Sequence, residues 1–239
     1  MTKIYIPHYT KLLERRSEIC KTCNSLAYEY EIISCYDKED LPTTNRSNHQ
    51  KEWEARVELI KPILLTNAGI ENLQQTEIEW LKYRKLKKAE ISLTYKHLIA
   101  LLKIASGKEI GIVFEDDVGI KNNSKEELVQ AIELVRQGVD YIDLAGGCSL
   151  PMYPNDEPIN KSKKVYLTNP SRSRTTAGYV ITPTAAEKLA KNLFPAILPL
   201  DWSFQYIFLR EKLRVGWSNP PAFIHGSQSH SQSSIQNNE

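Results

Sequence analysis

One apolar segment of this 239-residue chain ends in three consecutive carboxylates. Residues 112–114 (Ile-Val-Phe) are typical of a buried strand in a parallel sheet, and Glu115, Asp116 and Asp117 follow directly. Ligands of open α/β sheets bind at the carboxyl ends of such strands. Adjacent acids repel one another when buried, and a divalent cation that prefers oxygen ligands would relieve this repulsion. The segment therefore predicts a Mg²⁺ or Mn²⁺ site that receives a diphosphate, with a solvated acidic loop as the alternative.

The alternation of side chains along an extended segment assigns different directions to the three acids. Glu115 and Asp117 are expected to point one way and Asp116 the other. An acid–X–acid pair of this kind suits a bridging cation, with one carboxylate on the metal and the other near it or on a ribose. Several soluble folds use this arrangement, so the pattern alone does not name a reaction.

The composition excludes several classes of protein. A hydrophobic content of 41% with 25% charged residues is that of an ordinary globular chain, and the net charge of +2 gives no reason to expect a nucleic-acid partner. The apolar runs are too short to span a bilayer, and the N-terminus lacks the pattern of a signal peptide. We therefore expect a cytoplasmic chain, or a fragment of a larger one. The four cysteines show no paired metal-ligand spacing and are expected to be reduced.

The hydrophobic periodicity alternates between strands and helices along the chain. Such a pattern predicts a single α/β domain with a mostly parallel central sheet flanked by helices. A Pro-, Asn- and Lys-rich loop at residues 151–164 is a candidate mobile lid. The expected strands are residues 3–9, 28–35, 112–114, 141–144, 175–182 and 213–217. The expected helices are residues 10–24, a segment around 53–64, residues 78–105, one with a capping box at Ser124, residues 183–193, and one from Asp201.

Two further candidates for chemistry lie in the C-terminal third of the sequence. Asp201 stands at an expected helix start, where it is either an N-cap or a general base that takes a proton from an acceptor hydroxyl. Trp202 beside it is either a core residue or a platform for a sugar ring. His225 and His230 lie in a polar tail and could capture a Mn²⁺-like ion, although a lone histidine is usually a surface residue.

Basic residues gather in two places. Arg15 and Arg16 begin the first expected helix, where they either reach a phosphate or form a solvated face. A second cluster precedes His97 and either faces an anionic surface, which would give peripheral contact with the inner face of a membrane, or is a solvated helix face. Its members are Lys82, Arg84, Lys85, Lys87 and Lys88.

Short motifs recur in a fixed order along nearly the whole chain. They are Ile4-Tyr5-Ile6 with Glu14-Arg15-Arg16, Glu90-Ile91-Ser92 through His97-Leu98, Val113-Phe114-Glu115-Asp116-Asp117-Val118, Ala177-Gly178-Tyr179-Val180-Ile181-Thr182, Asp201 after a Pro-hydrophobic pair, and Ser233-Ser234-Ile235. In order and spacing this set resembles glycosyltransferase family 25, the lipooligosaccharide galactosyltransferase family. The sequence departs from the family pattern at Ser92 and Leu93, which replace Gly-Cys, and at Lys96, which replaces Ser.

The resemblance implies a GT-A-like fold and inverting transfer of a hexose, usually galactose, from a UDP-sugar to a hydroxyl of a glycan or glycolipid acceptor. It implies that residues 1–120 bind the donor and residues 121–239 the acceptor. Mn²⁺ or Mg²⁺ would be held by Asp117 with Glu115 and His225, and Asp201 would be the base, with Asp143 and Asp116 in reserve. The residues expected around the nucleotide sugar are Tyr5, Pro7, Arg15, Arg16, Lys96, His97, Glu115 and Asp116.

Two other classes of function remain compatible with the sequence. One is a different metal-dependent enzyme acting on nucleotides, such as a nucleotidyltransferase or a phosphohydrolase, although the chain has no P-loop or dinucleotide fingerprint. The other is a non-catalytic module that binds a glycan or a nucleotide. Glu115, Asp117 and Asp201 argue against this second class, because such a module has no need of these acids.

Overall fold

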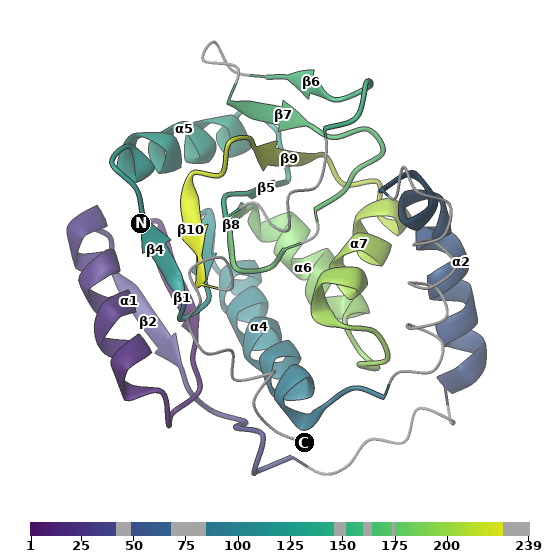
Figure 1. Cartoon of the computed structure of the whole chain (residues 1–239), viewed down its shortest axis with the longest axis horizontal. Coiled ribbons are helices and arrows are strands. Elements are labelled where there is room, and N and C mark those ends of the chain that lie inside the picture. Colours follow the sequence, from purple (N-terminus) through teal and green to yellow (C-terminus); the bar gives the residue numbers. More distant parts are fainter. Residues whose placement is uncertain (42–48, 68–84, 146–151, 160–163, 174, 227–239) are drawn as a thin grey trace.

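The computed structural model describes residues 1–41, 49–67, 85–145, 152–159, 164–173 and 175–226. The chain opens with a strand, a helix and a second strand, as the periodicity predicts, but later parts of it hold consecutive strands or consecutive helices (Figure 1). The strands are β1 (Lys3–Pro7), β2 (Tyr30–Ile33), β3 (Gly111–Phe114), β4 (Val118–Ile120), β5 (Tyr141–Asp143), β6 (Glu157–Pro158), β7 (Val165–Leu167), β8 (Gly178–Ile181), β9 (Val215–Ser218) and β10 (Phe223–His225). The helices are α1 (Leu13–Leu26), α2 (Gln50–Asn67), α4 (Lys88–Ser106), α5 (Ser124–Arg136), α6 (Pro183–Asn192) and α7 (Leu200–Arg210).

Eight of the strands form one sheet in the order β2-β1-β3-β8-β5-β9-β7-β6. The α/β class is confirmed, but the sheet is mixed rather than mostly parallel. β1 pairs in parallel with β2 and β3, and β5 with β9, whereas β8 runs antiparallel to both β3 and β5, and β7 to both β6 and β9. The sequence pattern could not show this, because β8 is buried on both faces and its residues are as apolar as those of a parallel strand.

Helices cover both faces of the sheet, so the core has two main halves. On one face α1 and α5 pack over residues such as Ile112 and Phe114, and on the other α4, α6 and α7 pack over Val113 and Tyr179. The period of two along β3 explains why neighbouring residues enter opposite halves. Helix α2 lies outside α7 (Figure 1), where Trp53 and Trp202 share a smaller apolar cluster. Trp202 is therefore a core residue, which was the alternative to a sugar platform.

Helix α4 carries the apolar stripe that seals one face of the sheet. Ala100, Leu101 and Ile104 are buried in it, and the helix ends at Ser106, as expected. Its start differs from the expectation, because residues 85–87 are not helical and the first helical residue is Lys88. The backbone N–H of Lys87 donates to the Glu90 carboxylate at 2.8 Å, and this bond closes the first turn. Residues 78–84 lie outside the described part of the chain.

Two smaller expectations about element ends were wrong. Ser124 does not form a capping box. The N-cap of α5 is Asn123, and the Ser124 hydroxyl instead donates to the carbonyl of Ala222 at 2.6 Å and accepts from the Lys121 N–H at 2.7 Å. The C-terminal region also contains a strand that was expected to be tail, because β10 pairs antiparallel with β4. The Ser124 hydroxyl thus ties the start of α5 to the segment that leads into β10.

The described cysteines are free, as the spacing predicts. Burial raises the pKa of the Cys23 thiol to about 12, so this residue is a packing group rather than a reactive one. Cys148 lies outside the described residues. Among the residues that the structure describes, no helix is long and apolar enough to cross a membrane.

Candidate functional site

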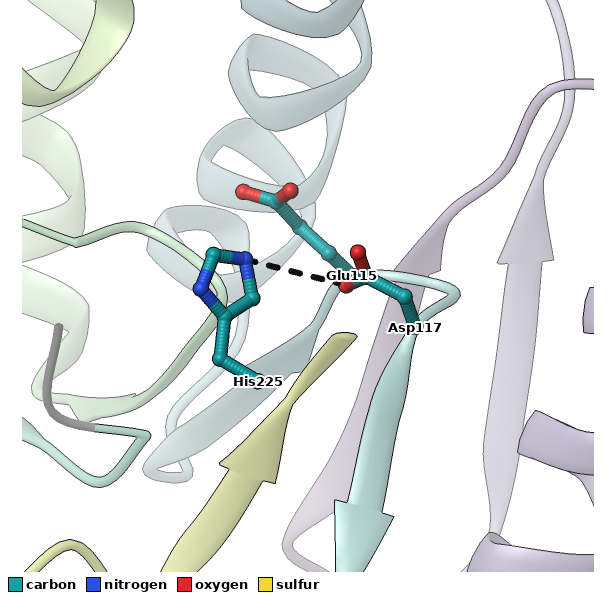
Figure 2. A group of neighbouring side chains, drawn as sticks. All are labelled: Glu115, Asp117 and His225. Atoms are coloured by element: carbon teal, nitrogen blue, oxygen red, sulfur yellow. Dashed lines mark ion pairs between the residues drawn. The ribbon is translucent and has the colours of Figure 1, made fainter. Parts of the chain in front are cut away.

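The acidic motif lies where β3 ends and β4 begins, beside the end of β10. In the β4–β10 ladder His225 is paired with Val118, the residue that follows Asp117. Glu115, Asp117 and His225 each offer one ligand atom, and these three atoms lie within 4.8 Å of one another (Figure 2). The pairing of β4 with β10 thus brings His225 next to Glu115 and Asp117, although the histidine is more than 100 residues away in the sequence. Glu115 and Asp117 are the two acids that were expected to point to the same side of the extended segment.

The chemistry of this group of three fits a divalent cation. Asp117 Oδ1 is buried and has no hydrogen-bond partner among the described residues, and His225 Nε2 is 4.0 Å from it. Burial, and after it the nearby charge of Glu115, raise the pKa of Asp117 to about 6, so a further positive charge beside it would stabilise the carboxylate. Two carboxylates and an imidazole are ligands that Mn²⁺ accepts. A cation here would supply the missing charge and use the unpaired oxygen.

A histidine from α4 holds the Glu115 side chain. His97 is fully buried, with Nε2 3.4 Å from Glu115 Oε1 and Nδ1 3.0 Å from the hydroxyl of Tyr179. The Thr176 hydroxyl donates to the same Glu115 oxygen at 2.8 Å. Burial acts to raise the pKa of Glu115, but the hydrogen bond and charge of His97 lower it below its ordinary value. His97 therefore contacts an acidic residue of the cluster, and its expected place beside the nucleotide sugar stays a prediction.

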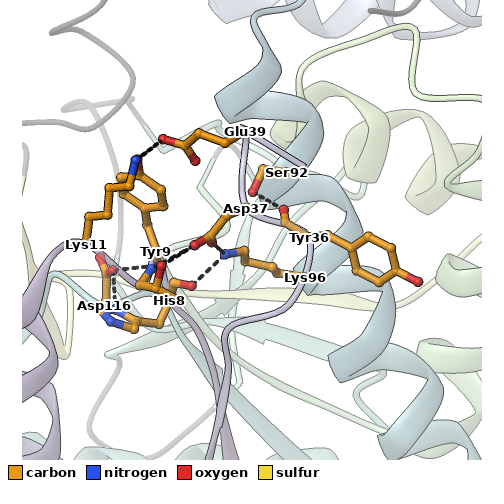
Figure 3. Close-up of polar contacts among 10 residues, drawn as sticks. His8, Tyr9, Lys11, Tyr36, Asp37, Glu39, Ser92, Lys96 and Asp116 are labelled. Carbon is orange, nitrogen blue, oxygen red and sulfur yellow. Dashed lines mark hydrogen bonds and ion pairs between the residues drawn. The ribbon is translucent and has the colours of Figure 1, made fainter. Parts of the chain in front are cut away.

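Asp116 points away from the cluster, as the alternation predicts. Its Oδ2 lies 2.8 Å from His8 Nδ1 and 3.4 Å from the backbone nitrogen of Tyr9 (Figure 3). Its Oδ1 accepts from Arg15 Nη1 at 3.1 Å. The same nitrogen of Arg15 lies 3.6 Å from Asp117 Oδ2. The Arg15 guanidinium thus bridges the two aspartates and is the cation nearest to the cluster in the described contacts.

The other residues expected around the nucleotide sugar are dispersed. Pro7 is buried at the end of β1, Tyr5 lies in the middle of that strand against the α4 side of the core, and Arg16 is exposed on α1. Lys96 is buried on α4, where its ammonium donates to the carbonyl of His8 at 2.6 Å and also binds Asp37. Of these four residues, Lys96 is linked to the acids through His8 and Asp116, and the role of all four at the nucleotide sugar stays a prediction.

Asp201 is the second residue of α7, and Pro199 is the N-cap, so Asp201 is not the capping residue. Asp201 is half-buried, and its Oδ1 accepts the N–H of Trp202 at 2.9 Å. One turn further along α7, the ring of Phe204 packs edge-on against His97 with the centroids 6.1 Å apart. Residues three apart are neighbours on a helix surface, so Asp201 lies next to the part of α7 that packs on His97.

The reserve base Asp143 is unsuited to contact a substrate. It is fully buried at the end of β5, its Oδ2 accepts from the Ser173 hydroxyl, and its Oδ1 accepts from the Ala145 N–H at 3.1 Å. Asp116 is likewise engaged with His8 and Arg15. Asp201 is the most accessible of the three candidates.

Several residues that contact the expected site residues have no signal of their own in the sequence motifs. His8, Asp37, Thr176 and Tyr179 contact the expected site residues directly or one step away. His8 could have been found from its place directly after β1, since strand ends meet at the same edge of a parallel pair. The other expectations that lie outside the described residues concern His230, Lys82, Arg84 and the block 233–235.

An α/β sheet with an acid–X–acid pair and a histidine at its strand ends defines a class of protein that can bind a phosphorylated ligand through a cation. Residues 1–204 match glycosyltransferase family 25, described as LPS biosynthesis protein. The chain therefore belongs to this family and is a glycosyltransferase, whose substrates are a nucleotide-sugar donor and a glycan acceptor.

The comparison with solved structures adds a distant likeness. The crystal structure of a glycosyltransferase involved in the glycosylation of the major capsid of PBCV-1 aligns with a TM-score of 0.42 and 11% identity, over 94% of this chain and 93% of that chain. A likeness of this size supports no conclusion about the site. No curated relative matches the chain at a significant level.

Proposed function

We propose that this protein transfers a hexose, with galactose as the first candidate, from a UDP-sugar to a hydroxyl of a glycan or glycolipid acceptor, with inversion at the anomeric carbon. The acceptor would be part of a lipooligosaccharide or another surface glycan. The observation that carries the proposal is the group Glu115, Asp117 and His225 in a member of family 25. The same site suits a donor that carries a diphosphate, because this group can hold a cation between the protein and the phosphates.

The proposal assigns Mn²⁺ or Mg²⁺ to Asp117, with Glu115 and His225 beside it. A bound cation would neutralise the negative charge that grows on the UDP leaving group. Arg15 adds a second positive charge at the same place, since its guanidinium already lies against Asp116 and Asp117. An arginine suits this role because its planar donors match phosphate oxygens.

Asp201 is proposed as the general base that deprotonates the acceptor hydroxyl. Two observations support this assignment: the half-buried Asp201 lies three residues before Phe204, which packs on His97, and Asp143 and Asp116 are engaged elsewhere. A single displacement with such a base gives inversion, since the acceptor attacks from the side opposite the leaving group. The C-terminal half, residues 121–239, would then bind the acceptor, and residues 1–120 the donor, with His225 as the exception.

A donor screen tests this function. UDP release is measured from a panel of UDP-sugars with a lipooligosaccharide acceptor, with Mn²⁺ and with the metal chelated, and the configuration of the product is read by NMR. We expect release from UDP-galactose that needs both metal and acceptor, and a product of inverted configuration. Release that ignores the acceptor would indicate a hydrolase, and release from no UDP-sugar would contradict the proposed donor class.

A further inference from the structure

Lys96 is a buried lysine that binds two protein acceptors. Its side chain is 3% exposed, and its Nζ donates to the carbonyl oxygen of His8 at 2.6 Å and to Asp37 Oδ1 (Figure 3). A buried ammonium is costly unless it is paired and hydrogen-bonded, and here both conditions are met. Because the charge is already used inside the protein, Lys96 is poorly placed to donate to a phosphate of the substrate.

Asp37 links Lys96 to Thr10, which lies in the loop that follows β1, two residues after His8. Its Oδ2 accepts from the Thr10 hydroxyl and from the Thr10 N–H at 3.3 Å. Burial acts to raise the pKa of Asp37, but the hydrogen bonds from Lys96 and Thr10 lower it below its ordinary value. The loop that follows β1 is therefore held at His8 by the lysine and at Thr10 by the aspartate.

This loop connects Lys96 to the acidic motif. His8 is 1% exposed, and its Nδ1 lies 2.8 Å from Asp116 Oδ2. Asp116 in turn accepts from Arg15, whose Nη1 is 3.6 Å from Asp117 Oδ2. A continuous set of hydrogen bonds and ion pairs thus runs from α4 through the loop to the aspartate at the candidate cation site.

We propose that Lys96 is a positioning residue for the acidic motif, acting through the backbone of His8 and the His8–Asp116 contact rather than by binding the donor. The inference rests on the proposed function in one respect, because it assumes that Asp117 binds a cation. Partners that orient metal-binding side chains commonly change metal affinity by roughly 10-fold to 100-fold when they are removed.

The test uses a charge-neutral pair of substitutions. Lys96→Met alone leaves Asp37 buried without its partner and is expected to unfold the protein, so Lys96→Met is combined with Asp37→Asn. The thermal midpoint of this double variant is measured first, and Mn²⁺ is then titrated with and without UDP while the EPR signal of free Mn²⁺ is followed. We expect a midpoint close to that of the wild type and Mn²⁺ affinity reduced about 10-fold in both titrations.

An exposed ion pair provides a matched control, because it joins the same two segments, the loop after β1 and the segment after β2. Lys11 Nζ lies 2.7 Å from Glu39 Oε1, both side chains are exposed, and neither contacts His8 or Asp116 in the described part of the chain. Lys11→Met with Glu39→Gln removes the same number of charges and should leave Mn²⁺ affinity unchanged. An equal loss in both double variants would overturn the proposal, because the effect would then be one of overall charge.

Two further results would also overturn it. Unchanged Mn²⁺ affinity in the Lys96–Asp37 double variant removes the positioning role, and a loss seen only with UDP present assigns Lys96 to the phosphates. If the wild type binds no Mn²⁺ even with UDP, the proposed function fails instead.

A second pair of variants tests the same connection without touching Lys96. His8→Asn keeps an N–H donor near the position of Nδ1, whereas His8→Leu removes it. We expect Mn²⁺ affinity near that of the wild type for His8→Asn and about 10-fold weaker for His8→Leu. Equal affinities in the two variants, with both proteins folded, would contradict the role given to the His8–Asp116 contact.

Discussion

At the scale of single residues, Asp117 is the acid of the site whose pKa is raised above its ordinary value. Its folded pKa of about 6 lies above the ordinary value of 3.8, because burial and Glu115 disfavour the charged form. Between about pH 4 and pH 6 the folded protein therefore binds a proton that the unfolded chain has lost, and stability of the metal-free protein falls as the pH rises through this window.

Asp117→Asn should remove this pH dependence. In metal-free buffer we expect the variant to be more stable than the wild type by about 1–3 kcal/mol at pH 7, with the difference vanishing towards pH 4. Urea unfolding of both proteins across this pH range measures it. A variant that is less stable than the wild type at pH 7 would show that Asp117 is satisfied without a cation. Since the proton competes with the metal, Mn²⁺ affinity of the wild type should also weaken below about pH 6.

Asp201 gives the second prediction at this scale. Asp201→Asn keeps the shape of the side chain and an oxygen that can accept the Trp202 N–H. The amide cannot, however, take a proton from the hydroxyl of the acceptor substrate. We expect turnover to fall by roughly 10²-fold or more while UDP binding in the presence of Mn²⁺ is unchanged. Steady-state rates combined with calorimetric titration of UDP separate the two effects. Full turnover in this variant would assign the base to another residue.

The directions of the acids were predictable from sequence, whereas the partners of the acids were not. A period of two is enough to separate Glu115 and Asp117 from Asp116. His225 reaches the cluster only because β10 pairs with β4, and a pairing between segments more than 100 residues apart leaves no local signal. The His97–Glu115 and His8–Asp116 contacts depend in the same way on how α4 and β1 pack.

At the scale of elements, the closeness of α4 to β3 depends on one glycine. A Cβ at Gly111 would lie 2.3 Å from Cγ1 of the buried Ile104 on α4, so the helix and the strand could not keep their present spacing. Gly111→Ala is expected to destabilise the protein by about 1–3 kcal/mol because the core becomes overpacked. Gly119→Ala is the control, since its nearest contact would be an ordinary 3.5 Å to Ile224. Equal unfolding free energies for the two variants, measured in urea, would contradict this account.

A buried ion pair anchors part of the segment that was expected to be a mobile lid. The Asp156 carboxylate forms two hydrogen bonds with the Arg172 guanidinium, one of them 2.7 Å long, and it also accepts the N–H of Tyr153 at 2.6 Å. The ring of Tyr153 covers the guanidinium at 3.5 Å. The described residues 152–159 are thus anchored to Arg172 through Asp156, which opposes motion of this part of the expected lid.

Removing one partner of this ion pair should be costly. Asp156→Asn leaves the Arg172 charge buried, and we expect a loss of about 3–5 kcal/mol in the free energy of unfolding. Asp156→Leu combined with Arg172→Met removes both charges and should recover most of that loss. A single variant within about 1 kcal/mol of the wild type would show that the loop opens easily and that the lid remains feasible.

At the scale of the whole molecule, the sequence predicted the layers but not the direction of every strand. The alternation of strands and helices and the apolar stripes were sufficient for an α/β class with helices on both faces. The sheet is mixed because β8 and β7 run antiparallel to their neighbours. The direction of each of these strands depends on the path of the chain between strands that are distant in the sequence. The role of Ser124 likewise depends on a tertiary contact, its hydrogen bond to the carbonyl of Ala222, which competes with the local capping signal.

The central claim is that Glu115, Asp117 and His225 hold a cation that in turn holds the diphosphate of the donor. Calorimetric titration of UDP into the wild type, Asp117→Asn and His225→Ala, each with Mn²⁺ and with the metal chelated, tests it most directly. We predict that Mn²⁺ strengthens UDP binding to the wild type, has no effect on Asp117→Asn, and has a smaller effect on His225→Ala. Equal UDP affinity with and without Mn²⁺ in the wild type, or an undiminished effect of Mn²⁺ in Asp117→Asn, would contradict the claim.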